Sequence, residues 1–325
     1  MSMYLDKTIP VESIASSTPK PKPKITIKSD KLKTTLRIHG LAVALIPLVG
    51  LGIAIVLASH LGIGLLEVGL LVGMCFLTMV GVSVGFHRYF THCTFETSTI
   101  MRVILAIVGS MACSGPLIYW VSNHRRHHQY SDRLGDPHSP YFDDDKPLDG
   151  FQRFWHSHIG WTLEHEITNS FVFAKDVLRD PTICKINQLY YFWILLGLAI
   201  PALLGGVHSG SWMGALSGLL WGGFIRIFLS TQFTFCINSI THLYGSRSFN
   251  TSEQSRNNIW LAIPTGGEAW HNNHHAFPNS AKFGLKWWQI DLGYWTIRTF
   301  ELAGLVWDVK VPTTGMIEAK SISHS

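Results

Sequence analysis

Four long apolar stretches constrain this chain more than any other feature of its sequence. A helix needs about 20 apolar residues to cross the hydrocarbon core of a bilayer. Stretches of about that length run through residues 41–59, 68–86, 189–207 and 212–237. Only 14% of the residues are charged, against about 25% in an ordinary soluble domain. We therefore predict an all-α integral membrane protein with four transmembrane helices.

A fifth apolar stretch, residues 103–121, is long enough to span a bilayer, but we predict that it does not. It contains Ser114, Gly115 and Pro116, and a fifth crossing would separate the histidine-rich segments on either side of it. An interfacial or re-entrant segment fits better. Arg226 is the only charge in the fourth stretch, and we expect it to snorkel to the far interface.

The distribution of basic residues predicts which side of the membrane each segment occupies. Loops 60–67 and 208–211 contain no Lys or Arg, whereas the opposite side carries the basic N-terminal tail, residues 87–188 and the C-terminal third. The positive-inside rule makes that second side cytoplasmic. We predict that residues 1–36 are a disordered tail. No aromatic or folded basic face accompanies its lysines, so we expect no nucleic-acid partner.

The histidines are clustered in the sequence. The order H-x-x-H-H occurs twice, as His124, His127 and His128, and again as His271, His274 and His275. Positions i, i+3 and i+4 share a helix face, so we expect each box to direct three imidazoles at one point. His87 and His92 are five residues apart, which does not suit one helix face, so we expect the helix to end or bend between them. Asn238 and His242 follow the fourth span with i, i+4 spacing.

Together these segments supply nine histidines, which is too many for one metal ion. A tetrahedral zinc takes four ligands and an octahedral ion about six. The count therefore predicts two ions, although imidazole suits Fe, Zn, Cu or Ni and the spacing leaves the metal open. We interpret His138 in "GDPHSP" as a turn residue. The isolated histidines we interpret as interfacial or packed side chains: His39, His60, His156, His158, His165, His208 and His324.

At this point the chain resembles the membrane fatty acyl desaturases, and within them the Δ9, stearoyl-CoA desaturase-like branch. The resemblance covers roughly residues 41–308. It is carried by "GFHRYFTHCTF", "WVSNHRRHHQYSDRLGDPHSP", "HSHIGW", "NSITHLYGSRSF" and "GGEAWHNNHHAFPNSAKFGLKWWQID". It divides the chain into the tail 1–36, a desaturase domain 37–310 and a C-terminal tail 311–325.

The resemblance implies a four-span bundle under a cytosolic helical cap that holds two iron ions. The implied iron ligands are His87, His92, His124, His127, His128, His242, His271, His274 and His275, with Asn238 acting through a water molecule. Trp120 and Trp161 match aromatic residues that line the bend of a narrow acyl tunnel, and Thr234 stands at the matching bend. Phe235 follows it where animal members have tryptophan, so the bend is expected to differ here.

The implied reaction uses O₂ and two electrons to insert a cis double bond, with Δ9 as the expected position. The substrate is an acyl thioester of CoA or acyl-carrier protein, or an acyl lipid. A separate donor supplies electrons: cytochrome b5, a ferredoxin or a rubredoxin. Carboxylates beside the ligands could orient the imidazoles, and Asp132, Asp136 and Glu268 are candidates.

Two other classes of function compete with desaturation. An acyl hydroxylase or acetylenase could use the same histidine boxes. A membrane metal sensor or transporter is the non-enzymatic alternative, but a transporter would place its ligands near the bilayer midplane. Here the histidines cluster at the ends of the spans and beyond, which favours the enzyme.

Overall fold

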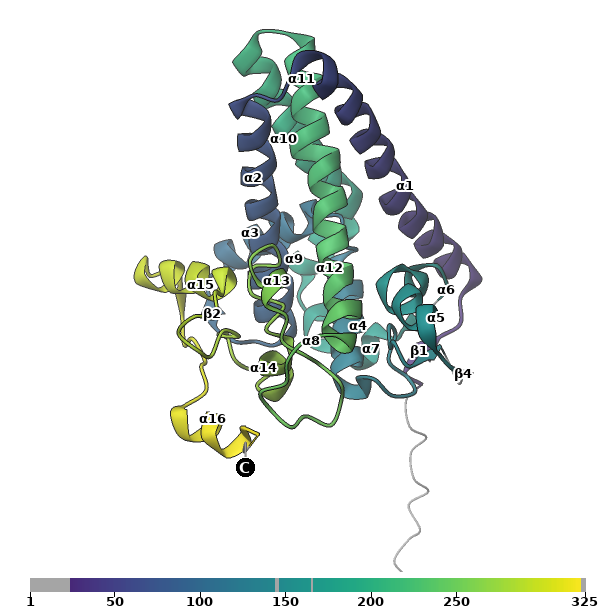
Figure 1. Ribbon diagram of the computed structural model, residues 1–325, viewed down its shortest axis with the longest axis vertical. Helices are drawn as coiled ribbons and strands as arrows, with labels where there is room; N and C mark the ends of the chain where they lie inside the picture. The colour runs from purple at the N-terminus through teal and green to yellow at the C-terminus, as the bar shows by residue number, and fades with distance from the viewer. Residues whose placement is uncertain (1–23, 144–145, 165, 323–325) are drawn as a thin grey trace, which may run out of the picture.

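The computed structural model describes residues 24–143, 146–164 and 166–322, and it is almost entirely helical (Figure 1). Its four longest helical segments cover Asp30–His60, Leu65–Thr91, Tyr190–Ser209 and Trp212–Leu243, and each is long and apolar enough to cross a membrane. All four overlap the predicted spans, which confirms the four-span prediction at the level of helix length and composition. Large apolar side chains such as Ile38, Leu45 and Val49 lie exposed along the first of them.

The four segments are built from the following elements. Helix α1 covers Asp30–Leu61. Helix α2 (Leu65–Met79) continues into the π-helix η1 (Val80–Thr91). Helix α10 covers Tyr190–Ser209, and the fourth segment joins α11 (Trp212–Gly218), the π-helix η3 (Leu219–Ile225) and α12 (Arg226–Leu243). Figure 1 shows the two short connections, 62–64 and 210–211, at one end of the bundle and most of the remaining helices around the other end.

The remaining elements are short. They are α3 (Thr99–Met111), α4 (Leu117–Tyr130), α5 (Gly150–Trp155), η2 (His156–Gly160), α6 (Trp161–Glu164), α7 (Ser170–Phe173), α8 (Lys175–Leu178), α9 (Pro181–Gln188), α13 (Ile259–Ala262), α14 (His271–Ala276), α15 (Leu292–Leu302) and α16 (Thr314–Lys320). Three antiparallel strand pairs tie them together: β1 (Thr26–Ile27) with β5 (Ile167–Thr168), β2 (Glu96–Thr97) with β6 (Val306–Trp307), and β3 (Phe142–Asp143) with β4 (Lys146–Pro147).

The predicted disordered tail, residues 1–36, is wrong for its last part. Residues 1–23 lie outside the described part of the chain, but β1 pairs with β5 and α1 already begins at Asp30. The Ser29 side chain caps this helix by accepting a hydrogen bond from the backbone N–H of Leu32. A serine cap followed by Asp30 in the first turn is a strong helix start, and it precedes the apolar run by about three turns.

The fifth apolar stretch is divided between two helices, which is consistent with the prediction that it does not span the bilayer. Helix α3 ends at Met111, α4 begins at Leu117, and residues 112–116 form a turn between them. Cys113 and Gly115 have positive φ angles of 66° and 98°, a conformation that ends a helix. Pro116 precedes α4 at a position where its missing N–H costs no intrahelical bond. No single helix therefore covers residues 103–121.

Arg226 does not snorkel; the expectation was wrong. Its side chain is fully buried, and its guanidinium donates to the carbonyl oxygens of Met111 (2.8 Å) and Gly197 (3.2 Å). Met111 is the last residue of α3, where carbonyls lack intrahelical donors. The carbonyl of Gly197 would normally accept from residue 201, which is Pro201 and has no N–H. Arg226 thus donates to two carbonyls that lack an intrahelical partner. The Met111 carbonyl lacks one because α3 ends there, and the Gly197 carbonyl lacks one because Pro201 has no N–H.

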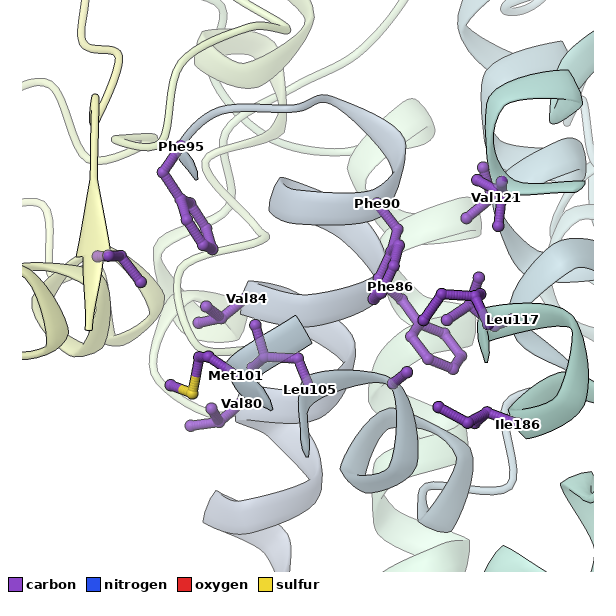
Figure 2. Close-up of a cluster of buried hydrophobic side chains, with 14 of the residues drawn as sticks. Val80, Val84, Phe86, Phe90, Phe95, Met101, Leu105, Leu117, Val121 and Ile186 are labelled. Atoms are coloured by element: carbon purple, nitrogen blue, oxygen red, sulfur yellow. The ribbon is translucent and has the colours of Figure 1, made fainter. Parts of the chain in front are cut away.

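The main buried cluster lies where η1, α3, α4 and α9 meet (Figure 2). Phe86, Leu105, Leu117 and Val121 are almost completely buried there. The close approach of η1 and α3 depends on two glycines, because a Cβ on Gly81 or Gly109 would collide with the facing helix. This packing fixes the end of the second span against α4, the two elements that carry the first two histidine segments.

Arg226 gives the first prediction. Arg226→Met should lower the free energy of unfolding by about 1–3 kcal/mol for each carbonyl left without a donor. In a Pro201→Ala background, the restored N–H of residue 201 can bond to the Gly197 carbonyl, so the same substitution should cost less. A double-mutant cycle of unfolding in detergent measures the difference. Equal costs in both backgrounds would show that the Gly197 carbonyl does not depend on Arg226.

Candidate metal centre

Nine histidine side chains converge at the end of the bundle opposite the short connections. They form two groups, and within each group the ligand nitrogens lie within 4.8 Å of one another. The five-histidine group contains His87, His92, His124, His128 and His274; the four-histidine group contains His127, His242, His271 and His275. The groups adjoin, since the rings of His128 and His275 stack with centroids 4.5 Å apart. All nine histidines singled out in the sequence are brought together.

The unusual spacing of His87 and His92 is explained by η1. In this π-helix the N–H of His92 donates to the carbonyl of His87 over 3.1 Å, a bond between residues five apart. The wider turn brings the two rings to 4.9 Å between centroids. The helix ends at Thr91, as expected, but the π-turn is what puts both histidines in one group. Single π-turns are frequently found at functional sites.

The two H-x-x-H-H boxes do not each serve one point, contrary to the prediction. In α4, His124 and His128 join the five-histidine group and His127 joins the other. In α14 the division is reversed: His271 and His275 belong to the four-histidine group and His274 to the five-histidine group. Successive residues are about 100° apart around a helix, so the first and third histidines differ by about 40° and the second and third by about 100°. Each helix therefore contributes to both groups.

Carboxylates lie beside the Nδ1 atoms of four of these rings. The Nδ1 atom of His127 lies 3.0 Å from Asp136, that of His242 lies 3.0 Å from Asp132, and that of His275 lies 3.7 Å from Glu253. His87 Nδ1 bonds to Glu268, which also accepts from Ser83 and Arg88. A carboxylate on Nδ1 fixes the tautomer and turns Nε2 inward. Asp132, Asp136 and Glu268 were expected here; Glu253 and Arg88 were not.

The arrangement of nitrogens fits a cation in each group. A neutral imidazole has one N–H, and the carboxylates hydrogen-bonded to His87, His127 and His242 place it on Nδ1, leaving a lone pair on Nε2. His87 Nε2 lies 3.1 Å from His274 Nε2, and His242 Nε2 lies 3.0 Å from His271 Nε2. Within the described residues, His127 Nε2 is buried without any partner. Each group therefore presents at least one inward-facing lone pair that a metal ion could accept.

The electrostatics favour the neutral form of seven of the nine imidazoles. Burial, followed by the mutual repulsion of neighbouring rings, lowers the pKa of His124, His128 and His274 well below the ordinary value. The pKa values of His92, His127, His271 and His275 are lowered in the same way. Burial alone would raise the pKa of Glu268, but His87 and Arg88 outweigh it and hold this pKa below its usual value. Neutral imidazoles beside ionised carboxylates are the state that binds metal.

Two of the cavities that adjoin the histidines share part of their lining. The α2-side cavity, about 110 Å³, is lined mainly by α2, η1, α12 and residues 264–268; the α1-side cavity, about 100 Å³, is lined mainly by α1, α4, α12 and residues 113–115. Both are lined by Ser114, Trp120, His124, Thr234 and Asn238. Trp120 stacks on His124 with centroids 4.9 Å apart, so the cavities meet beside the five-histidine group.

The predicted tunnel residues all line these cavities. Trp120 and Thr234 face both, and Trp161 and Phe235 face the α1-side cavity. Asn238 also faces both. His138 lies in a turn, as predicted, and is buried beside His127 and Asp136 with its ring 4.3 Å from that of His127. His39, His60, His156, His158 and His208 lie outside the two groups, and His165 and His324 lie outside the described residues.

Comparison with known proteins agrees with this site. The fatty acid desaturase profile matches residues 62–308. A hex-5-enoyl-[acyl-carrier protein] acetylenase of Moorena producens is 52% identical over 92% of this chain and 94% of its own. An sn-1 stearoyl-lipid 9-desaturase of Anabaena variabilis is 38% identical over 71% of this chain and 79% of its own. A Delta-9 acyl-lipid desaturase of Arabidopsis thaliana is 36% identical over 72% of this chain and 71% of its own.

The described residues combine four helices long and apolar enough to cross a membrane with a buried cluster of histidines that could hold metal. The chain belongs to the fatty acid desaturase family, and within that family to the Δ9 branch. It is accordingly an oxygen-dependent oxidoreductase of lipid metabolism, which confirms the predicted enzyme class.

The carboxylates on Nδ1 give the second prediction. Asp132→Asn keeps the shape beside His242 but removes the charge, which should lower metal affinity of the four-histidine group about 10–100-fold. The metal affinity of the five-histidine group should not change. We expect bound metal per chain, measured after dialysis against a chelator, to fall to about half. Asp176→Asn is the matched control, because Asp176 pairs with Arg125 and is half exposed. Parallel loss from both groups would contradict the assignment.

The lowered histidine pKa values give the third prediction. Below the ordinary value of 6.5 the unfolded chain binds protons that the folded, metal-free chain does not. Stability should therefore fall as the pH drops below about 6.5, by about 1.4 kcal/mol per pH unit for each such histidine. Unfolding of the metal-stripped protein between pH 8 and pH 5 measures this slope. His275→Ala should reduce the slope, whereas replacement of the exposed His60 should leave it unchanged.

Proposed function

We propose that the chain removes two hydrogens from adjacent carbons of an acyl chain, at a centre of two iron ions, and inserts a cis double bond. The observation that carries this proposal is the position of the five-histidine group, which adjoins the four-histidine group, beside the paired cavities. The five-histidine group would hold one iron and the four-histidine group the other. Asn238 would reach an iron through water, which its position facing both cavities supports.

Iron with O₂ and two electrons supplies the oxidant that unactivated methylenes require. The contribution of this chain's own residues is to position the acyl chain beside the metal centre. Trp120, Thr234 and Asn238 stand where the cavities meet, so an acyl chain threaded through both would pass His124. Trp161 and Phe235 would line the part of the path on the α1 side. Neighbouring methylenes are chemically alike, so only such a preformed path can select one bond.

The surroundings of the site support a multi-pass protein with its histidine centre on the cytoplasmic face. The short connections at the opposite end contain no Lys or Arg, and the basic segments lie on the histidine side, as the positive-inside rule requires of the cytoplasm. A soluble donor could reach the centre there; cytochrome b5, a ferredoxin and a rubredoxin are the candidates. The substrate is an acyl thioester or an acyl lipid.

A second candidate is removal of two further hydrogens from the same bond to give an alkyne. The 52% identical relative is named an acetylenase that acts on a chain attached to acyl-carrier protein, whereas the Δ9 lipid desaturases share 36–38%. Both reactions need the same oxidant and the same positioning, so the histidine centre serves either.

The fourth prediction tests the reaction. In a host that lacks a Δ9 desaturase, with each electron donor co-expressed in turn, wild-type chain should produce a new unsaturated acyl chain and His275→Ala should not. Mass spectrometry with localisation of the unsaturated bond identifies the product as alkene, alkyne or hydroxy acid. The variant should still insert into the membrane, because His275 contacts the other ligands and not the spans' apolar faces.

Metal analysis separates the enzyme from a metal-binding protein without oxidation chemistry. We expect about two irons per chain in the purified wild type. Bound zinc, with no acyl product under any donor, would favour the non-enzymatic alternative. Full activity of His275→Ala would remove the four-histidine group from the proposal.

A further inference from the structure

One hydroxyl in the α1-side cavity has no partner. Thr231 is 6% exposed, and within the described residues its Oγ1 atom makes no hydrogen bond. It lies on α12 and lines the α1-side cavity only. A buried hydroxyl without a partner is unfavourable unless something in the cavity bonds to it. The position therefore indicates a polar group of a ligand beside Thr231.

The other cavity threonines behave differently. Thr78, Thr234 and Thr265 each donate to the carbonyl four residues earlier in their own segment, over 2.8, 2.9 and 2.6 Å. Those bonds satisfy the hydroxyls internally, as is usual for threonine in helices, and leave the methyl groups for the cavity. Thr162 is likewise satisfied by the carbonyl of Ile159. Thr231 alone among these five keeps its hydroxyl available.

The two cavities also differ in the polar groups that they leave without partners. In the α2-side cavity, the hydroxyls of Thr78 and Thr265 donate to backbone carbonyls and that of Ser83 donates to Glu268. The α1-side cavity contains the Thr231 hydroxyl, which has no partner within the described residues. It is also lined by residues 36–43 of α1, close to the start of the predicted first span. An acyl chain would thus enter with its polar end on the α1 side.

We propose that the Thr231 hydroxyl donates a hydrogen bond to the carbonyl oxygen of the substrate's ester or thioester, and that this contact sets which carbons reach the metal centre. The inference rests on the proposed function. Thr231, Thr234, Phe235 and Asn238 are spaced i, i+3, i+4 and i+7, so they follow one face of α12. Asn238 lies about 10 Å further along that helix. A carbonyl fixed at Thr231 therefore places carbons several bonds away beside the histidines.

Binding to the full-length, metal-free protein in detergent tests the contact without any oxidation. Probes are a saturated octanoyl thioester on acyl-carrier protein, its CoA counterpart and an sn-1 octanoyl lipid, each with a matched thioether or ether that lacks the carbonyl. In wild type, loss of the carbonyl should weaken binding roughly two- to tenfold. In Thr231→Val, probes with and without the carbonyl should bind with equal affinity. In Thr231→Ser, the difference in affinity between the two kinds of probe should return. The probe that binds most tightly identifies the carrier.

The active enzyme supplies the second readout. Wild type should place the unsaturated bond at one position, and Thr231→Val should give a mixture of neighbouring positions because the chain can slide. Thr296→Val is the control, since Thr296 lies on α15 and its hydroxyl bonds to Leu292. If Thr231→Val does not fold, the affinities of carbonyl and carbonyl-free probes for the wild-type protein still test the proposal.

The outcomes separate the two proposals. Equal binding of carbonyl and carbonyl-free probes to wild type, or a single unchanged bond position in Thr231→Val, would overturn the role of Thr231 and leave the oxidation intact. A carbonyl-dependent affinity that Thr231→Val removes, in a protein that oxidises no acyl chain, would support the anchor and refute the proposed reaction.

Discussion

Nine buried imidazole rings packed against one another are the constraint on which the end of this fold depends. Carboxylates hydrogen-bonded to Nδ1 of His87, His127 and His242 place the proton of the neutral ring on that nitrogen. The Nε2 lone pairs of these three rings then point into the two groups. With a cation in each group, as we propose, metal binding and folding of this region would be linked.

The repeated H-x-x-H-H pattern is explained by the proposed pair of ions held side by side. Each of α4 and α14 gives two histidines to one group and one to the other, in opposite senses. Neither group is then formed by one helix alone, so both require α4 and α14 to be docked correctly. The remaining histidines come from the ends of two long apolar segments, His87 and His92 at the π-turn of η1 and His242 at the end of α12. The histidine cluster thereby ties the bundle to the helices that cover it.

The sequence predicted what depends on composition and local spacing. The four spans follow from uninterrupted apolar length, and the break in residues 103–121 follows from Gly115 and Pro116. The nine histidines were recognised from their clustering. Their division between groups could not be predicted, since i, i+3, i+4 spacing defines a face but not its partners. Glu253 and Arg88 were missed because no local pattern marks them: each acquires its role from a segment far away in the chain.

Arg226 shows how a membrane interior and a catalytic site can depend on the same residue. Sequence spacing suggested a cation on its way to the interface, yet its guanidinium lies inside the bundle on the carbonyls of Met111 and Gly197. The turn that follows Met111 contributes to the walls of both cavities: Ala112 and Ser114 line the α2-side cavity, and Cys113, Ser114 and Gly115 line the α1-side cavity. A helix end in an apolar environment needs an internal donor for its free carbonyl. The buried arginine provides one, and the turn that it stabilises forms part of the wall along which the proposed acyl chain would pass the histidines.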